Sequence, residues 1–222
     1  MITGTRKPME EIRAMIAPFG RVLVAGCGTC VAECASGGEK EVALLASQLR
    51  MDAKLRKISL EVGEITLDRQ CVYEFIDQLT PFLENYDAVL SLACGAGVQA
   101  VAEVFPQWVI LPGLDTGFLG ETREAGLWLE NCRGCGECRL HLFAGVCPIT
   151  RCAKRLFNGP CGGSRAGQCE VSPEVQCAWH LILERLERQG RMDCLEEIYP
   201  PCDWSRHQGR GPRKIQREDQ RA

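Results

Sequence analysis

Cysteines are concentrated in the stretch from Asn131 to Trp179, and their spacing could hold metal. The first three run C-x2-C-x2-C, and the fourth is followed by Pro148. This is close to the thiolate run that wraps a [4Fe–4S] cluster, except that the loop before Cys-Pro is longer than usual. Because each cubane needs four thiolates, the stretch could supply two clusters. The eight cysteines are Cys132, Cys135, Cys138, Cys147, Cys152, Cys161, Cys169 and Cys177.

Disulfides and zinc are the alternatives for these thiols. The opening residues lack the apolar core of a secretion signal, so we expect a cytoplasmic protein, and disulfides are rare in that compartment. C-x2-C is also a zinc-binding spacing. Zinc sites usually pair two such units separated by roughly a dozen or more residues. A third cysteine two residues further on, followed by Cys-Pro, favours iron–sulfur over zinc.

The grouping of the eight thiols can be predicted by analogy with two-cluster ferredoxins. In those proteins the cysteine before proline serves the other cluster, not the one held by its preceding triplet. By that analogy the triplet Cys132, Cys135 and Cys138 takes a distant fourth ligand, with Cys177 as the candidate. The second cluster would then be held by Cys147, Cys152, Cys161 and Cys169.

A third group of cysteines lies in the first half of the chain. Cys27, Cys30 and Cys34 follow an apolar run that predicts a buried strand over 21–26, and Cys94 follows another over 88–93. The carboxyl ends of parallel strands meet at one edge of a sheet, so the four thiols could meet as a third [4Fe–4S] site. A phosphate-binding turn is disfavoured, because GCGTC does not continue as G-x-G-x-x-G. Simple packing of small residues is the remaining alternative.

The elements that would position these cysteines alternate between strands and helices. We predict strands over 21–26, 57–66, 88–93 and 108–111, and helices over 39–55, 69–83 and 98–105. This alternation indicates an α/β fold with a Rossmann-like parallel sheet. A loop-dominated, cysteine-rich iron–sulfur module would follow it. The expected divisions are an arm over 1–19 that includes a short helix, an α/β domain over 20–128, the module over 129–204 and a basic tail over 205–222.

Composition limits the classes of function. The net charge of −3 gives no argument for a nucleic-acid partner, and no apolar run approaches the roughly 20 residues of a membrane span. No acid–base pair suggests a catalytic pocket. Cys71 falls beside the apolar stripe of the predicted 69–83 helix and is interpreted as a buried free thiol. Cys194 and Cys202 lie outside the dense spacings and stay unassigned.

About nine-tenths of the chain resembles one family. It is similar to the small subunit that accompanies methylenetetrahydrofolate reductase in acetogen-type one-carbon metabolism, a family also described as the methylenetetrahydrofolate reductase C-terminal domain. The matching segments are CRGCGECRL from Cys132, GVCPITRCAKRLFNGPCGG from Gly145, GQCEV from Gly167, CAWHLILERLERQG from Cys177 and IYPPCDWS from Ile198, together with VAGCGTCVAEC and LACGAGVQ in the first half.

The resemblance implies a function and a partner. Such subunits transfer electrons to or from a separate flavoprotein, a TIM barrel with FMN or FAD that reduces methylenetetrahydrofolate. We therefore expect a non-catalytic iron–sulfur subunit of a Wood–Ljungdahl-type reductase complex, with three [4Fe–4S] clusters. Because the family is also associated with zinc, a zinc-binding structural scaffold of the same reductase is the alternative.

The second half of the chain also suggests where the partner binds. Aromatic and basic residues gather there, and a polar tail of this charge suits an acidic surface. We expect the eight-cysteine module and the tail to form the docking face, with the tail holding the reductase. The apolar, aromatic and basic residues concentrated there are Phe143, Leu156, Phe157, Trp179, Trp204, Arg206, Arg210, Arg213, Lys214 and Arg217.

Overall fold

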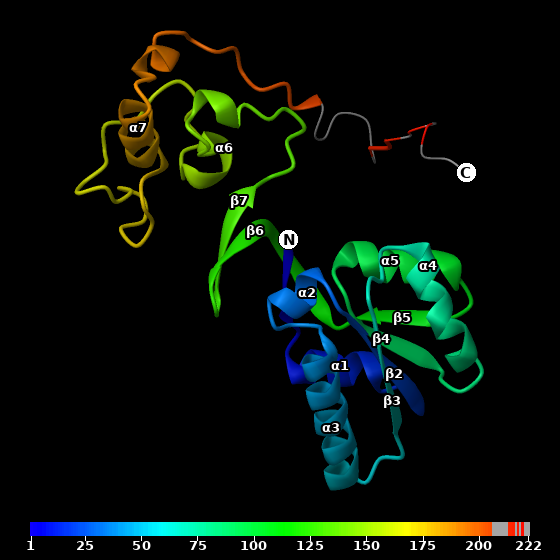
Figure 1. Ribbon diagram of the computed structural model, residues 1–222. Helices are drawn as coiled ribbons and strands as arrows, with labels where there is room; N and C mark the ends of the chain where they lie inside the picture. Colours follow the sequence, from blue (N-terminus) through cyan, green and yellow to red (C-terminus); the bar gives the residue numbers. More distant parts are fainter. Residues whose placement is uncertain (206–212, 216, 218, 220–222) are drawn as a thin grey trace. The chain divides into compact units, whose positions relative to one another are not determined.

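The chain folds into two compact units, Met1–Leu129 and Glu130–Ala222, which divide inside strand β7 (Leu127–Cys132). The computed structural model describes residues 1–205, 213–215, 217 and 219. The first unit contains a parallel sheet with its helices, whereas the second consists of short helices joined by long loops (Figure 1).

A four-stranded parallel sheet forms the centre of the first unit. Its strands stand in the order β3 (Glu61–Leu67), β2 (Arg21–Cys27), β4 (Ala88–Leu92) and β5 (Val109–Pro112). Every residue of β4 is buried, and so is all of β2 after its first residue. Continuous apolar strands of this kind need cover on both faces. The predicted α/β fold with a parallel sheet is confirmed.

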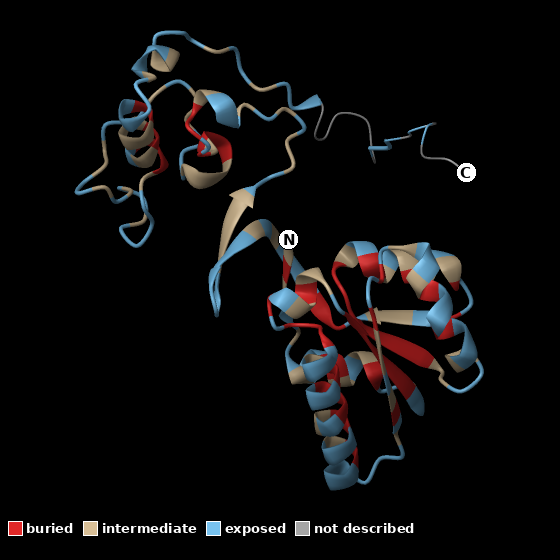
Figure 2. Cartoon of the chain, viewed as in Figure 1, coloured by how far each residue is buried: buried red, intermediate tan, exposed pale blue. Residues whose placement is uncertain are grey.

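Helices cover both faces of this sheet. Alternate residues of a strand point to opposite faces, so Val22 and Val24 join one core cluster while Leu23 and Ala25 join another. Buried positions therefore line the strands and the inner sides of the helices (Figure 2). The first cluster is covered by α1 (Met9–Ile16) and α3 (Glu39–Arg56), and the second by α4 (Tyr73–Ile76), the 3-10 helix η1 (Asp77–Phe82) and α5 (Gly95–Val104).

The first 19 residues contribute to the fold of this unit and do not form a separate arm. Strand β1 (Ile2–Arg6) pairs antiparallel with β6 (Leu114–Glu124) in a second, three-stranded sheet of order β1-β6-β7. The Thr3 hydroxyl donates to the Phe118 carbonyl at 3.1 Å and accepts from the Phe118 amide at 3.0 Å. The α1 side chains Ile12 and Ile16 are buried in the core. The N-terminal segment is thus anchored at both of its elements.

The helix expected over 69–83 is the clearest departure from the predicted elements. Only the short α4 and η1 form there. Pro81 lies inside η1, and proline cannot donate a backbone hydrogen bond. Gln70 is fully buried, with its side chain bonded to strand carbonyls, so the residues around it adopt a loop instead of a first helical turn.

Close packing beside β4 predicts a stability effect at Gly37, in the loop between α2 (Cys30–Glu33) and α3. A Cβ there would lie 1.9 Å from the Leu92 carbonyl oxygen, so Gly37→Ala must displace the loop. We expect a loss of roughly 1–3 kcal/mol in the free energy of unfolding, measured by urea denaturation. Gly20→Ala is the control, since its Cβ would meet nothing closer than an Asp87 oxygen at 3.8 Å. Equal stability of the two variants would contradict this packing.

The second unit has a small core of its own. Its helices are η2 (Leu140–Leu142), α6 (Pro148–Arg151), α7 (Ala178–Arg188) and η3 (Met192–Leu195). Trp179 on α7 is 1% exposed, and its indole N–H donates to the Leu156 carbonyl at 2.8 Å. The other buried members of this core are Phe143, Ala144, Val146, Ala178, Ile182 and Leu186. Most cysteines of this unit lie in the loops around that core.

Candidate metal centres

The cysteine triplet lies on a loop that glycines shape. Gly134 and Gly136, one in each two-residue spacer, have φ of 61° and 84°, a backbone conformation that glycine adopts most easily. The Gly134 amide donates to the Cys132 sulfur at 3.3 Å. The Cys135 thiol donates to the Glu137 carbonyl at 3.5 Å. The spacers therefore turn the chain sharply between successive thiols and aim a backbone amide at one of them.

The triplet lines a cavity of about 330 Å³ together with a fourth cysteine, Cys147. The rest of the lining includes apolar side chains, among them Phe143, Pro148, Ile149 and Phe157. Cys147 reaches the cavity because it directly precedes α6, whose Pro148 and Ile149 are buried. The first thiol set is therefore Cys132, Cys135, Cys138 and Cys147.

The remaining four cysteines line a second cavity, of about 220 Å³. Two backbone bonds order its loop: the Cys169 amide donates to the Val175 carbonyl at 2.9 Å, and the Cys177 amide donates to the Gly167 carbonyl at 2.8 Å. The Gly163 amide donates to the Cys161 sulfur at 3.4 Å, much as Gly134 does in the first set. The second thiol set is Cys152, Cys161, Cys169 and Cys177.

This grouping differs from the ferredoxin analogy. The sequence predicted Cys177 with the triplet and Cys147 with the second set, whereas the two exchange places in the cavities. Cys177 is held at the start of α7 and faces the loop of Cys161 and Cys169. The longer segment between the triplet and Cys147 forms η2 and returns the chain to the triplet's own cavity.

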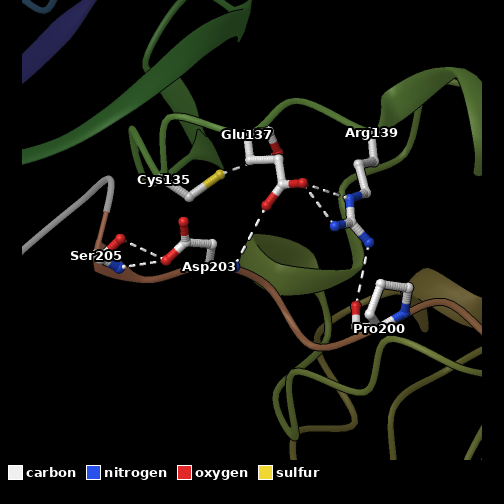
Figure 3. Close-up of polar contacts among 6 residues, drawn as sticks. All are labelled: Cys135, Glu137, Arg139, Pro200, Asp203 and Ser205. Carbon is white, nitrogen blue, oxygen red and sulfur yellow. Dashed lines mark hydrogen bonds and ion pairs between the residues drawn. The ribbon is translucent and has the colours of Figure 1, made fainter.

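Hydrogen bonds connect the closing segment, residues 198–205, to the loop that carries the cysteine triplet, and we call these contacts the clasp (Figure 3). Glu137 accepts from the Arg139 Nη2 at 2.6 Å and from the Asp203 amide at 3.3 Å, and Arg139 donates to the Pro200 carbonyl at 3.1 Å. Cys202 lies between the two anchored residues. Burial raises the pKa of Cys202, Arg139 lowers it, and nearby Cys135 and Cys147 raise it, so this thiol lies close to the first set.

This clasp predicts a local change in backbone dynamics. Arg139→Ala removes the donor to Pro200 and the Arg139–Glu137 ion pair, so the closing segment should detach more often. Hydrogen–deuterium exchange of residues 198–205 should become several-fold faster. Lys154→Ala, which removes the exposed Lys154–Glu170 pair beside the second cavity, should leave that exchange unchanged. Identical exchange in both variants would show that other contacts hold the segment.

In the first unit the predicted cysteines lie near the carboxyl edge of the parallel sheet, and Cys27, Cys34 and Cys94 belong to one buried cluster. Cys27 ends β2, Cys30 begins α2 and Cys94 is the residue before α5. The Cys34 thiol instead has partners of its own: the Gly4 amide donates to it at 3.4 Å, and the Ser36 hydroxyl lies 3.3 Å away. A different cysteine, Cys71, has Cys27, Cys94 and Cys30 as electrostatic neighbours.

Comparison with known proteins connects the second unit to a family. Residues 111–205 match the family described as methylene-tetrahydrofolate reductase C terminal. No curated protein and no solved structure matches the chain.

The matched segment contains both thiol-lined cavities and the contacts between Glu137, Arg139 and the closing residues. It also contains Cys202, to which the cysteine spacing assigns no role. The signal in the sequence that could have pointed to Cys202 is its position in IYPPCDWS, the last of the segments that resemble the family. Among the helices of residues 1–205 and the described tail positions, none has the length and apolar character to cross a membrane.

The donor chemistry of the matched segment fits iron–sulfur clusters. Each cavity presents four thiols, and backbone amides point at a sulfur in each. In residues 1–205, 213–215, 217 and 219, no three His, Cys, Asp or Glu side chains stand close enough to hold a single ion. Each cavity therefore has its four thiols around an open space, and the described residues do not form a closed coordination shell.

Proposed function

We propose that the chain is an iron–sulfur electron-transfer subunit of a methylenetetrahydrofolate reductase complex in Wood–Ljungdahl-type one-carbon metabolism. It would relay electrons to or from the FMN or FAD of a separate catalytic subunit. The observation that carries this proposal is the pair of four-thiol cavities inside the segment that matches the reductase family.

The residues of each cavity have distinct tasks in this proposal. The two thiol sets would each hold one cluster, and bound [4Fe–4S] clusters supply one-electron transfer. In the first cavity Phe143 and Phe157 exclude water, and the Gly134 amide stabilises negative charge on sulfur. In the second, Trp179 and Leu183 provide apolar cover. Burial and amide hydrogen bonds are the means by which a protein tunes such potentials.

A shared aromatic core connects the two cavities. Phe143 lines the first and Trp179 the second, and their ring centroids lie 5.8 Å apart in an edge-to-face arrangement. Phe157 packs 5.1 Å from Phe143 on the first side. Both cavities are therefore built against the same buried rings. This supports a relay in which electrons pass from one site to the other.

The expected docking face needs a correction. Phe143 and Trp179 are each 1% exposed, so they belong to the core and cannot meet a partner. Trp204 is 43% exposed and follows the clasp at Asp203. Arg206 and Arg210 lie outside the described residues. Arg213 donates to the Gly134 carbonyl at 3.0 Å, which places it on the triplet loop. We propose that Trp204 and the basic tail meet the flavoprotein beside the first cavity.

Rapid-mixing spectroscopy with the flavoprotein tests the function. The full chain, purified without oxygen and reduced, is mixed with the oxidised catalytic subunit, and the flavin absorbance is followed. The flavin should bleach, and Trp204→Ala should slow the bleaching without changing the iron content. A chain that binds the flavoprotein but never reduces its flavin would favour the zinc scaffold.

A further inference from the structure

We propose that Cys71 is the fourth ligand of a four-thiolate metal centre at the carboxyl edge of the parallel sheet, with Cys27, Cys30 and Cys94, and that Cys34 lies outside it. The inference rests on the proposed function in that the favoured occupant is an iron–sulfur cluster. It concerns the first unit, most of which lies outside the family match.

Strand order places Cys71 beside the other thiols. Cys27 is the last residue of β2, Cys94 comes two residues after β4, and Cys71 comes four residues after β3. These are three adjacent strands, with β2 between the other two. Because all are parallel, their carboxyl ends open onto the same edge, where α/β folds bind ligands.

Gln70 fixes the loop that carries Cys71. It is fully buried, and its amide nitrogen donates to the carbonyls of Ala25 and Gly26 on β2, each at 2.9 Å. Its amide oxygen accepts from the Ser91 hydroxyl of β4 at 2.6 Å. One side chain thus ties the end of the β3 loop to both neighbouring strands. The next residue, Cys71, is held where those strands end.

Contacts on either side keep this loop close to Cys27 and α5. The Gly28 amide donates to the Leu67 carbonyl at 2.8 Å, and the Cys27 sulfur lies 3.9 Å from the Asp68 carbonyl oxygen. In the first turn of α5, a Cβ on Gly97 would lie 3.0 Å from the Gln70 Cβ, so the absence of a side chain permits the close approach. Cys27, Cys94 and Cys30 are the cysteines close enough to Cys71 to interact with it electrostatically.

Cys34 is enclosed by contacts of its own. Its sulfur faces the carbonyl oxygens of Val31 at 3.6 Å and Gly4 at 3.7 Å, and it is 5% exposed. The Gly4 amide also donates to this sulfur at 3.4 Å, and Gly4 lies on β1. Cys34 therefore serves to join the strand of Gly4 to α2, and Cys71, which is exposed, is free to bind.

Metal analysis of the full chain tests this assignment. The wild type and the variants Cys71→Ala, Cys94→Ala and Cys34→Ala are purified without oxygen, and iron and zinc per chain are measured. Cys71→Ala should lose as much metal as Cys94→Ala, about four irons for a cluster or one zinc, and the double variant should lose no more. Cys34→Ala should keep the metal. Because Cys71 is exposed, its alanine variant should fold normally, as circular dichroism will show.

Alkylation of the wild-type chain gives a second readout that does not depend on any variant folding. Iodoacetamide labelling with mass spectrometry should modify Cys71 after chelation and spare it in the loaded chain. Loss of metal from Cys34→Ala with full retention in Cys71→Ala would overturn the inference, and so would equal labelling of Cys71 in both states. If these two results are obtained while the second unit keeps its clusters, this inference fails and the proposed function stands. A wild-type chain without iron would instead defeat the proposed function, and zinc held by the same four thiols would still uphold the ligand set.

Discussion

Replacing Cys147 with alanine should remove the same cluster as replacing Cys135, because both thiols line the first cavity. Each single variant should lose about four irons per chain, and the double variant should lose no more than either. Cys135→Ala combined with Cys177→Ala should lose about twice as much, since Cys177 lines the second cavity. Iron analysis of anaerobically purified protein, with circular dichroism to confirm folding, measures these losses.

The opposite additivity would contradict the grouping. If the pair Cys135 and Cys147 lost two clusters while the pair Cys135 and Cys177 lost one, the ferredoxin-like pairing would be restored. Cys194→Ala is the matched control. Cys194 packs at the edge of the core, accepts from Arg191 at 3.4 Å and lines neither cavity, so its loss should leave the iron content unchanged.

Replacing Phe143 with alanine should strongly destabilise the second unit. The ring is 1% exposed and packs edge-to-face with Phe157, Trp179 and Tyr199 at centroid distances of 5.1, 5.8 and 6.0 Å. Truncating a buried phenylalanine typically costs about 3–5 kcal/mol, through lost burial and the cavity left behind. Because the ring lies at the first cavity and against Trp179 of the second, both clusters should become labile.

Trp204→Ala provides the control for this prediction. Trp204 is 43% exposed, so its removal should change stability by less than about 0.5 kcal/mol. Denaturant unfolding, followed by near-ultraviolet circular dichroism, and the rate of iron release to a chelator measure the two effects. If Phe143→Ala released iron no faster than Trp204→Ala, the shared aromatic core would not be what holds the cavities.

The parallel sheet could be predicted from sequence because its signals are local. The run RVLVAG is apolar except for its first residue, and AVLSLA is apolar except for one serine. Strands that are covered on both faces have this pattern. The inner face of helix α3 follows from spacing alone, since its apolar residues Val42, Leu45, Leu49 and Ala53 recur at helical intervals and all are buried. In these elements local pattern and tertiary environment agree.

The elements that sequence missed depend on distant partners. Strand β6 is largely exposed and carries no clean alternation of apolar and polar residues. It is stabilised by pairing with β1, which lies more than a hundred residues earlier in the chain. Over 69–83 the helical spacing was real, but Gln70 forms three hydrogen bonds to neighbouring strands instead. Tertiary bonding overrode local propensity there.

The cysteines show the same limit at the level of the site. Dense spacing drew attention to the eight cysteines that line the two cavities, but which thiols share a cavity depends on how η2 and α7 return the chain. Cys71 was overlooked because it was assigned to a helix that does not form. The predicted strand over 57–66 ends within one residue of β3, so with a loop in place of that helix the rule that placed Cys27 and Cys94 at the sheet edge would have placed Cys71 there too.

Metal content of the full chain, purified and kept without oxygen, tests the central claim most directly. The protein should be brown, contain several irons and little zinc per chain, and show the electron paramagnetic resonance signals of reduced [4Fe–4S] clusters after dithionite treatment. A colourless chain that contains zinc and no iron would contradict an electron-transfer role and make the protein a structural scaffold.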